Sequence, residues 1–256
     1  MLKHFRLPLA AIALAAAGAS GAHAAQPSLA GKTVVLVHGA FADGSSWSKV
    51  IPILEARGLH VVAVQNPLSS LDDDASAAKR AIDQQKGPVI LVGHSWGGAV
   101  ITEAGTDDKV KALVYVAAFA PDAGQSVNDM IKPFPPAPWV GALQVDSGGF
   151  LTLPQASILS DFAQDLPAAE ARGVSAVQGP WAARCMDDKL TSAAWSSKPS
   201  WFVVAGKDHM IDPRFQVAMA TKIKAHITQV DASHVVMLSQ PAKVAATIIE
   251  AAESVQ

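Results

Sequence analysis

The chain has 256 residues, of which 50% are apolar and 16% are charged, and its formal net charge is −2. This balance excludes a disordered chain, and the missing basic excess argues against nucleic acid as a partner. The single cysteine, Cys185, excludes an internal disulfide framework and a cysteine-rich metal site, so we expect one globular domain with a sizeable core.

The first 24 residues predict a secretory signal peptide. Two basic residues open the segment, a short apolar run follows, and small residues lead to an A-x-A cleavage pattern that ends at Ala24. The apolar run is too short to span a bilayer comfortably. We therefore expect residues 1–24 to be removed and residues 25–256 to form a single periplasmic or secreted domain without stable membrane insertion.

Short apolar runs alternate with helical patterns along the remaining chain. Such runs are typical of strands that are buried on both faces of a parallel sheet. The expected strands are Thr33–Val37, His60–Val64, Val89–Gly93, Ala112–Ala118, Trp201–Ala205 and Ile227–Val230. The expected helices are Ser46–Ala56, Asp72–Gln85, one from Ala99, Pro213–Ala225 and Pro241–Ala252. This alternation predicts an α/β fold with a doubly wound, mostly parallel sheet.

One long stretch, about 121–198, contains no clear strand of that sheet. Insertions of this length in a compact α/β domain are commonly functional, and we expect a small cap over the strand ends. A Gly148-Gly149-Phe150 turn and a helix over Asp161–Arg172 are expected within it. Aromatic side chains of the cap and of one core loop are expected to bind substrate. They are Phe41, Phe134, Trp139, Phe150 and Trp181.

A serine lies at the turn after the expected strand Val89–Gly93. Residues 93–98 read Gly-His-Ser-Trp-Gly-Gly, which is a G-x-S-x-G pattern between a strand and a helix. Only small residues fit beside a serine on such a sharp turn, which exposes the hydroxyl at the end of the sheet. Ser95 is therefore the expected nucleophile, and a plain glycine-rich connection is the alternative.

A serine nucleophile needs a general base and an acid that orients the base. On a strand–turn–helix serine site, the acid and then the histidine follow later strands. Asp208 follows one such strand and His234 follows the next, so both lie at carboxyl ends of strands, where open α/β sheets carry their chemistry. Asp208 is thus the expected acid and His234 the expected base.

Three other residues compete for these roles. His209 could serve as the base, but it lies one strand too early in the chain. Asp212 and Asp231 compete with Asp208, although Asp212 before a proline is typical of a helix N-cap. His94 lies directly before the serine on the same sharp turn, which we call the serine elbow, and its side chain is expected to point away from the nucleophile.

The loop after the first strand is the expected oxyanion site. It reads His38-Gly39-Ala40-Phe41 and can aim a backbone N–H at a developing negative charge. We favour the N–H of Ala40 over that of Phe41, and the N–H of Trp96, next to the serine, as the second donor.

No metal or cofactor is expected, because the chain has no H-E-x-x-H spacing and no phosphate-binding glycine loop. The acidic run Asp72-Asp73-Asp74 could suggest a cation site. We interpret it instead as the solvated start of a helix, where negative charge is favourable.

These motifs resemble the α/β-hydrolase fold superfamily from Thr33 to Ala252. Four segments, 37–40, 93–98, 117–122 and 234–238, resemble in particular the branch of plant methylesterases and hydroxynitrile lyases, of which this chain would be a bacterial exported member. The resemblance implies a cofactor-free esterase with a small cap and a minimal sheet of about six strands.

The chain departs from the lyases of that branch at two places. The lyases resemble H-T-x where this chain has His38-Gly39-Ala40, and they tend to carry a lysine where Val235 follows His234. We therefore expect a serine hydrolase that cleaves carboxylic esters of small to medium apolar substrates through an acyl-enzyme. The alternatives are a lactonase, an amidase, an acyltransferase, a lyase or a ligand-binding protein. The sequence leaves the natural substrate and the oligomeric state open.

Overall fold

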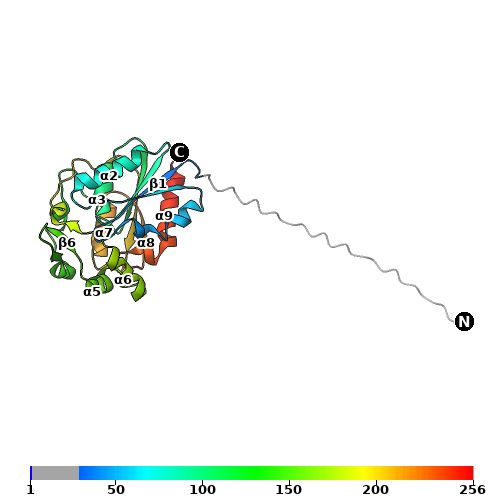
Figure 1. Ribbon diagram of the computed structural model, residues 1–256. Coiled ribbons are helices and arrows are strands. Elements are labelled where there is room, and N and C mark those ends of the chain that lie inside the picture. Colours follow the sequence, from blue (N-terminus) through cyan, green and yellow to red (C-terminus); the bar gives the residue numbers. More distant parts are fainter. Residues whose placement is uncertain (2–28, 256) are drawn as a thin grey trace.

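The computed structural model describes Met1 and residues 29–255, so the expected signal peptide lies, apart from Met1, outside the described residues (Figure 1). Six strands form one parallel sheet in the order β2-β1-β3-β4-β8-β9. They are β1 (Thr33–Val37), β2 (His60–Val64), β3 (Val89–His94), β4 (Val110–Val116), β8 (Ser200–Ala205) and β9 (His226–Val230). The predicted α/β fold with a parallel sheet of about six strands is confirmed.

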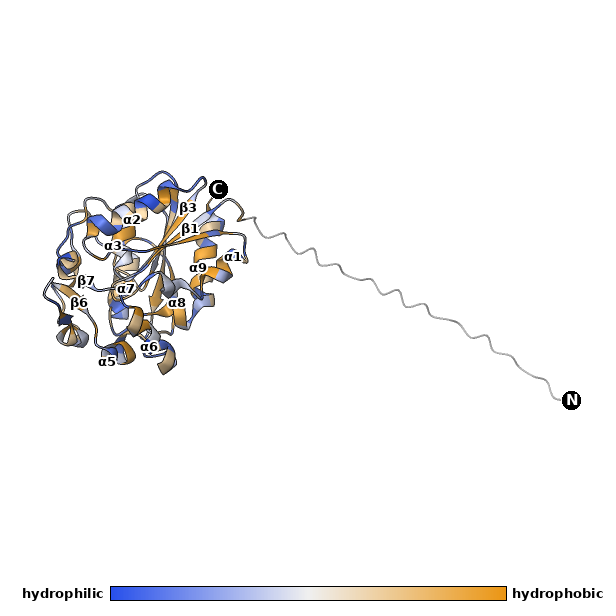
Figure 2. Cartoon of the chain, in the orientation of Figure 1, coloured by the Kyte–Doolittle hydropathy of each residue, from blue (hydrophilic) through white to orange (hydrophobic). Residues whose placement is uncertain are grey.

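The central strands are buried because they are continuous apolar runs. Every residue of β1, β3 and β8 is buried, whereas the edge strand β9 has exposed positions. Five of the strands match the predicted bounds to within one residue. The exception is β4, which begins and ends two residues earlier than expected; it ends at Val116 because Ala117 adopts a left-handed φ of 44° and leaves the strand. Figure 2 shows the hydrophobic central strands, with the more hydrophilic segments at the periphery of the molecule.

Helices cover both faces of the sheet (Figures 1 and 2). The helix α9 (Pro241–Ser254) packs on β3, β4 and β8 and contacts α1 (Ile51–Glu55). On the other side, α2 (Leu71–Asp83) and α3 (Gly97–Ala104) contact each other and β1, and α7 (Pro213–Lys222) packs on β8. The short α8 (Val236–Ser239) precedes α9.

The predicted helix over residues 46–56 is wrong in part. A 3₁₀ turn covers Gly44–Trp47, and α1 begins separately at Ile51. Pro52 explains the break, because a proline lacks the N–H that a helix interior requires and is tolerated only in the first turn. By contrast, the expected N-cap of α7 is present: the Asp212 side chain accepts a hydrogen bond from the Arg214 N–H, and Pro213 lies in the first turn.

The chain between β4 and β8 forms the cap, which gathers around α5, α6 and β6 at one end of the molecule (Figure 1). A small antiparallel sheet in the order β5-β6-β7 lies within it. The cap elements are α4 (Val127–Ile131), η2 (Pro138–Ala142), β5 (Gln144–Val145), β6 (Phe150–Thr152), α5 (Gln155–Ser157), η3 (Ile158–Phe162), α6 (Ala168–Val177), β7 (Trp181–Ala182), η4 (Ala183–Met186) and η5 (Ala194–Ser196).

The predicted cap helix over residues 161–172 is wrong in its bounds. A π-helical turn ends at Phe162, and α6 begins only at Ala168. Pro167 separates them, because proline disfavours helical geometry in the residue before it. The expected turn at Gly148 and Gly149 is present, with Gly149 at a φ of 79°. Within the described residues no helix combines the length and the apolar character needed to cross a bilayer.

Candidate active site

Ser95 occupies a strained turn between β3 and α3. Its φ is 54°, in the left-handed region that non-glycine residues rarely adopt. The surrounding backbone leaves no space for side chains: a Cβ on Gly39 would lie 2.7 Å from the Ser95 Cβ, and one on Gly97 would lie 2.6 Å from the Val37 carbonyl oxygen. Gly97 of the motif and Gly39 of the loop after β1 are therefore required by the close packing of the turn against that loop.

A cavity of about 1070 Å³ opens beside this turn. It brings together nine of the ten residues that the sequence nominated. They are Ala40, Phe41, Ser95, Trp96, Phe134, Trp139, Trp181, Asp208 and His234. The tenth, Phe150, does not line the cavity, because it lies in β6, where its backbone pairs with Ala182 and its side chain is half-buried against the core. The expectation that Phe150 forms a pocket wall is therefore corrected.

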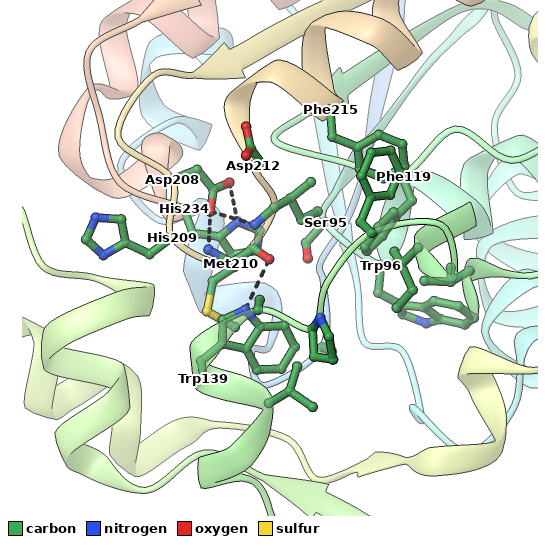
Figure 3. A pocket seen from close by; sticks show the side chains of 18 of the residues that line it. Ser95, Trp96, Phe119, Trp139, Asp208, His209, Met210, Asp212, Phe215 and His234 are labelled. Carbon is green, nitrogen blue, oxygen red and sulfur yellow. Dashed lines mark hydrogen bonds and ion pairs between the residues drawn. The ribbon is translucent and has the colours of Figure 1, made fainter. Parts of the chain in front are cut away.

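Asp208 and His234 form a buried hydrogen-bonded pair (Figure 3). The Nδ1 of His234 lies 2.7 Å from the Asp208 Oδ2, and both side chains are almost fully buried. With Nδ1–H donating to the carboxylate, Nε2 carries the free lone pair of the neutral ring, which is the arrangement a general base requires. Both side chains come from loops that follow neighbouring strands, β8 and β9, as the chain order predicted.

Gln216 also holds the carboxylate, and the sequence analysis missed it. Its Nε2 donates to the Asp208 Oδ2 at 2.7 Å and to the Ile211 carbonyl at 2.8 Å, and its Oε1 accepts from the Ala205 N–H at 3.0 Å. The other oxygen, Oδ1, accepts from the N–H groups of Met210 at 2.7 Å and Ile211 at 3.0 Å. Four N–H donors thus compensate for the removal of the Asp208 carboxylate from water.

Two of the three competing residues, His209 and Asp212, line the rim of the same cavity, but none of the three contacts His234 among the described residues. Asp212 pairs with Arg214 at 2.6 Å, and Asp231 pairs with Lys207 at 2.7 Å, both at the surface. The exposed His209 ring contacts the Ser160 carbonyl at 3.2 Å and points away from Ser95 in Figure 3. Among these candidates, only Asp208 contacts His234.

Ser95 and His234 line the same cavity without a hydrogen bond between them among the described residues. In unliganded active sites such contacts are commonly long and tighten only in the complex. His94 contacts the loop that carries His234: its Nε2 lies 3.0 Å from the His234 carbonyl oxygen. Burial holds the pKa of His94 well below its usual value, so this ring is neutral and donates that hydrogen bond.

The expected oxyanion donors lie at the cavity wall. Ala40 and Trp96 both line it, and within the described residues neither backbone N–H donates a hydrogen bond to the protein. The Ala40 loop is fixed by His38, whose Nε2 accepts from the Asn66 N–H at 2.9 Å, while Nδ1 lies 2.9 Å from the Gly39 carbonyl oxygen. Burial lowers the pKa of His38, which keeps the ring neutral for this dual role.

The acidic run at the start of α2 does not have a uniform environment. Asp72 and Asp73 are exposed, but Asp74 is fully buried, so our interpretation of all three as solvated is wrong for Asp74. It lies on the stripe of α2 that includes Leu71, Ala75 and Ala78, because residues three and four positions apart share a helix face. The described residues contain no group of three or more His, Cys, Asp or Glu side chains that could hold a metal ion.

A parallel sheet that carries a serine elbow and a buried Asp–His pair at its carboxyl edge defines an α/β-type hydrolase. The model of the alpha/beta hydrolase family matches residues 34–247 of the chain. This match covers most of the sequence, and the chain belongs to this family.

Among curated proteins, the chain is similar to enzymes of the predicted branch. Methylesterase 3 of Arabidopsis thaliana is 27% identical over 86% of this chain and 95% of its own length. Methylesterase 2 is 34% identical over 42% of this chain, and Alpha-hydroxynitrile lyase of the same plant is 36% identical over 34%. These two matches span 49% and 40% of the relatives. The resemblance to the methylesterase and hydroxynitrile lyase branch is thereby confirmed.

A solved structure confirms the fold. The crystal structure of polyneuridine aldehyde esterase superposes with a TM-score of 0.75 over 86% of this chain and 98% of that protein, at 20% sequence identity. At this identity the likeness shows the fold alone.

Proposed function

We propose that this protein is a serine hydrolase that cleaves carboxylic esters through an acyl-enzyme. The observation that carries the proposal is the buried Asp208–His234 hydrogen bond of 2.7 Å beside a cavity that also contains Ser95 on its strained turn. An acid, a base and a nucleophile on the carboxyl ends of strands are the parts that acyl transfer requires. The esterase relatives support the same reaction class.

In the proposed mechanism, the Ser95 hydroxyl attacks the ester carbonyl while His234 Nε2 accepts its proton. Asp208 keeps the ring in the tautomer with the proton on Nδ1 and stabilises the imidazolium that forms. The N–H groups of Ala40 and Trp96 stabilise the oxyanion. His234 then protonates the leaving alkoxide, and a water molecule activated by the same residue releases the acid from Ser95.

The cavity supports apolar esters of small to medium size as the substrate class. Its walls are mainly aromatic and aliphatic, with Phe41 packed edge-to-face against Trp139 and Trp181 at centroid distances of 6.4 and 5.8 Å. A cavity of about 1070 Å³ is roughly at the upper end of the range for small-molecule sites, so it admits a substituted aryl or acyl group as well as a small alcohol.

The test is hydrolysis of p-nitrophenyl esters with acyl chains from acetyl to palmitoyl by the wild type and by Ser95→Ala. We expect hydrolysis that is lost in Ser95→Ala, with an optimum at short to medium chains. Equal turnover by both proteins would remove Ser95 as the nucleophile. An absence of activity with every ester would leave lyase, lactonase, amidase or binding functions as the better hypotheses.

We also propose that the protein is exported, on the basis of the pattern in residues 1–24. The measurement is the intact mass of the protein recovered from the periplasm of a Gram-negative host that expresses the full chain. A mass corresponding to a chain that begins at Ala25 is expected. Recovery of the full-length chain from the cytoplasm alone would contradict export.

A further inference from the structure

The carboxylate of Asp74 is buried near the oxyanion region and has no role in the mechanism above. It lies in the first turn of α2 with 0% of its surface exposed. The described residues place no cation within ion-pair distance of it. Burial of a carboxylate without a cation is costly, so its retention in the core needs an explanation beyond helix stability.

Two N–H donors contact this carboxylate, one on each oxygen. The indole Nε1 of Trp96 donates to Oδ2 at 2.7 Å, and the Leu68 backbone N–H donates to Oδ1 at 2.7 Å. Trp96 follows the proposed nucleophile directly, and its backbone N–H is a proposed oxyanion donor. Asp74 therefore fixes the side chain of the residue whose backbone must be held in place during the reaction.

The second donor connects Asp74 to the cap. Leu68 adopts a left-handed φ of 58°, and its carbonyl oxygen accepts a hydrogen bond from the Ala182 N–H of β7 at 2.8 Å. The neighbouring Trp181 lines the cavity and packs against Trp96 at a centroid distance of 5.4 Å. The Asp74 carboxylate thus connects Trp96 of the serine elbow with Leu68 of the loop after β2, and through Leu68 with the cap strand β7.

We propose that Asp74 is a positioning residue for the oxyanion site, which in its ionised form holds the Trp96 indole and, through Leu68, the cap strand β7. This inference rests on the proposed function of Ser95 and Trp96. A carboxylate accepts hydrogen bonds at both oxygens, whereas the protonated acid carries a donor on one of them and holds an N–H there more weakly. Ionised Asp74 therefore defines the active geometry.

The proton that Asp74 binds makes this positioning pH-dependent. Burial raises the pKa of Asp74 to about 6, against the opposing effect of its two hydrogen bonds. The titratable groups near it are Asp73 on its own helix, which raises the pKa further, and the Cys185 thiol of η4. Burial raises the pKa of that thiol to about 12, so it remains neutral in the relevant range.

The first test compares Asp74→Asn with Asp73→Asn. Both variants remove one charge from the same helical turn, but Asp73 is exposed, and its carboxylate accepts hydrogen bonds from Ser69 and Ser70 and not from Trp96. We expect kcat for ester hydrolysis to fall about tenfold in Asp74→Asn, with KM nearly unchanged, because the lost interaction supports the transition state. Asp73→Asn should retain wild-type kcat. Equal kcat values in the two variants would overturn the proposal.

A double-mutant cycle separates positioning from general destabilisation. Trp96→Phe keeps a ring but removes the indole N–H, so Asp74→Asn should cost about twofold or less in kcat in that background. An undiminished tenfold loss in the Trp96→Phe background would show that Asp74 does not act through the indole and would overturn the proposal.

A readout that does not depend on activity completes the test. The ¹⁵N indole resonance of Trp96, recognised by its loss in Trp96→Phe, should shift with pH in the wild type with a midpoint near 6 and should remain fixed in Asp74→Asn. Absence of a titration in the wild type would overturn the proposal. If no ester is hydrolysed, the proposed function fails, but this titration still decides whether Asp74 holds the indole.

Discussion

Two buried carboxylates support the cavity wall, Asp208 as part of the wall and Asp74 behind Trp96, and their environments differ. Asp208 accepts four N–H hydrogen bonds, one of them from His234. Asp74 accepts two, from Trp96 and Leu68. Each is also linked to a cap tryptophan: Trp139 donates to the Met210 carbonyl beside Asp208, and Trp181 packs on Trp96 beside Asp74. The comparison teaches that burial alone does not assign a role, because the donors around a carboxylate decide which proton chemistry it supports.

The largest expected effect concerns Asp208. Replacement by asparagine should lower kcat about 10⁴-fold, because the amide permits the tautomer of His234 with the proton on the wrong nitrogen. The measurement is steady-state kinetics with the best p-nitrophenyl ester. Asp212→Asn is the matched control, because Asp212 contacts Arg214 and not the histidine. A comparable loss in Asp212→Asn, with Asp208→Asn active, would reassign the acid.

Asp74 should contribute to the pH dependence of stability with a sign opposite to that of the buried His38 and His94, whose lowered pKa values make the fold less stable as pH falls. The pKa of Asp74 is raised to about 6 in the folded state, so between about pH 4 and 6 this carboxyl group binds more protons in the folded protein than in the unfolded chain. The contribution of Asp74 to the free energy of unfolding therefore falls as pH rises through this window, by about 3 kcal/mol at most. Activity should rise with pH in the same range, because positioning requires the ionised form.

Urea unfolding at several pH values checks this expectation. As pH rises from about 4 to 6, the free energy of unfolding of the wild type should fall relative to that of Asp74→Asn, because the contributions of His38 and His94 are common to both proteins and cancel in the difference. The contribution of Asp73 to the free energy of unfolding changes with pH in the opposite direction. Hydrogen bonds from Ser69 and Ser70 lower the pKa of Asp73, so this contribution is lost as pH falls, and it is absent from Asp73→Asn. Parallel pH curves for Asp74→Asn and the wild type would contradict the raised pKa.

The environment of Asp208 can be weakened without removing the acid. Gln216→Met keeps the length of the side chain but removes one donor to Asp208 and the acceptor for the Ala205 N–H. We expect kcat to fall about tenfold and the free energy of unfolding to fall by about 1–3 kcal/mol, because buried polar groups lose their partners. Kinetics and thermal unfolding of the variant measure both. Unchanged kcat with lowered stability would limit Gln216 to a structural role.

The smallest expected effect compares the two cap tryptophans. Trp139→Phe loses the hydrogen bond of 3.1 Å to the Met210 carbonyl, whereas the Trp181 side chain has beside it the Cys185 sulfur, which is a weak acceptor. We expect a loss of a few-fold in kcat/KM for Trp139→Phe, corresponding to about 1 kcal/mol, and a smaller loss for Trp181→Phe. Equal effects would mean that packing, and not the link to the acid loop, governs the contribution of Trp139.

The sheet could be predicted from the sequence because its signals are local. Buried parallel strands are continuous apolar runs, and the turn at Ser95 requires glycines at fixed positions. The order of Asp208 and His234 along the chain, combined with the rule that strand ends share one edge, was sufficient to nominate the pair that the structure brings into contact.

The remaining features depend on contacts between distant residues. Gln216 reaches Asp208 from the first turn of α7, and no local pattern marks a helical glutamine as buried. Asp74 carried a signal that we did not use: it shares the apolar stripe of α2 with Ala75 and Ala78, which its acidic neighbours obscured. The cap followed no period, because short 3₁₀ and π turns between prolines leave none to detect.

The only cysteine makes the junction between core and cap measurable. Cys185 is fully buried in η4, immediately after β7, with its Sγ 3.7 Å from the Leu68 carbonyl oxygen. A water-soluble disulfide reagent can reach this thiol only when the junction opens locally. The rate of labelling by such a reagent therefore reports how often β7 separates from the core, and substrates that occupy the cavity should slow it in proportion to their binding.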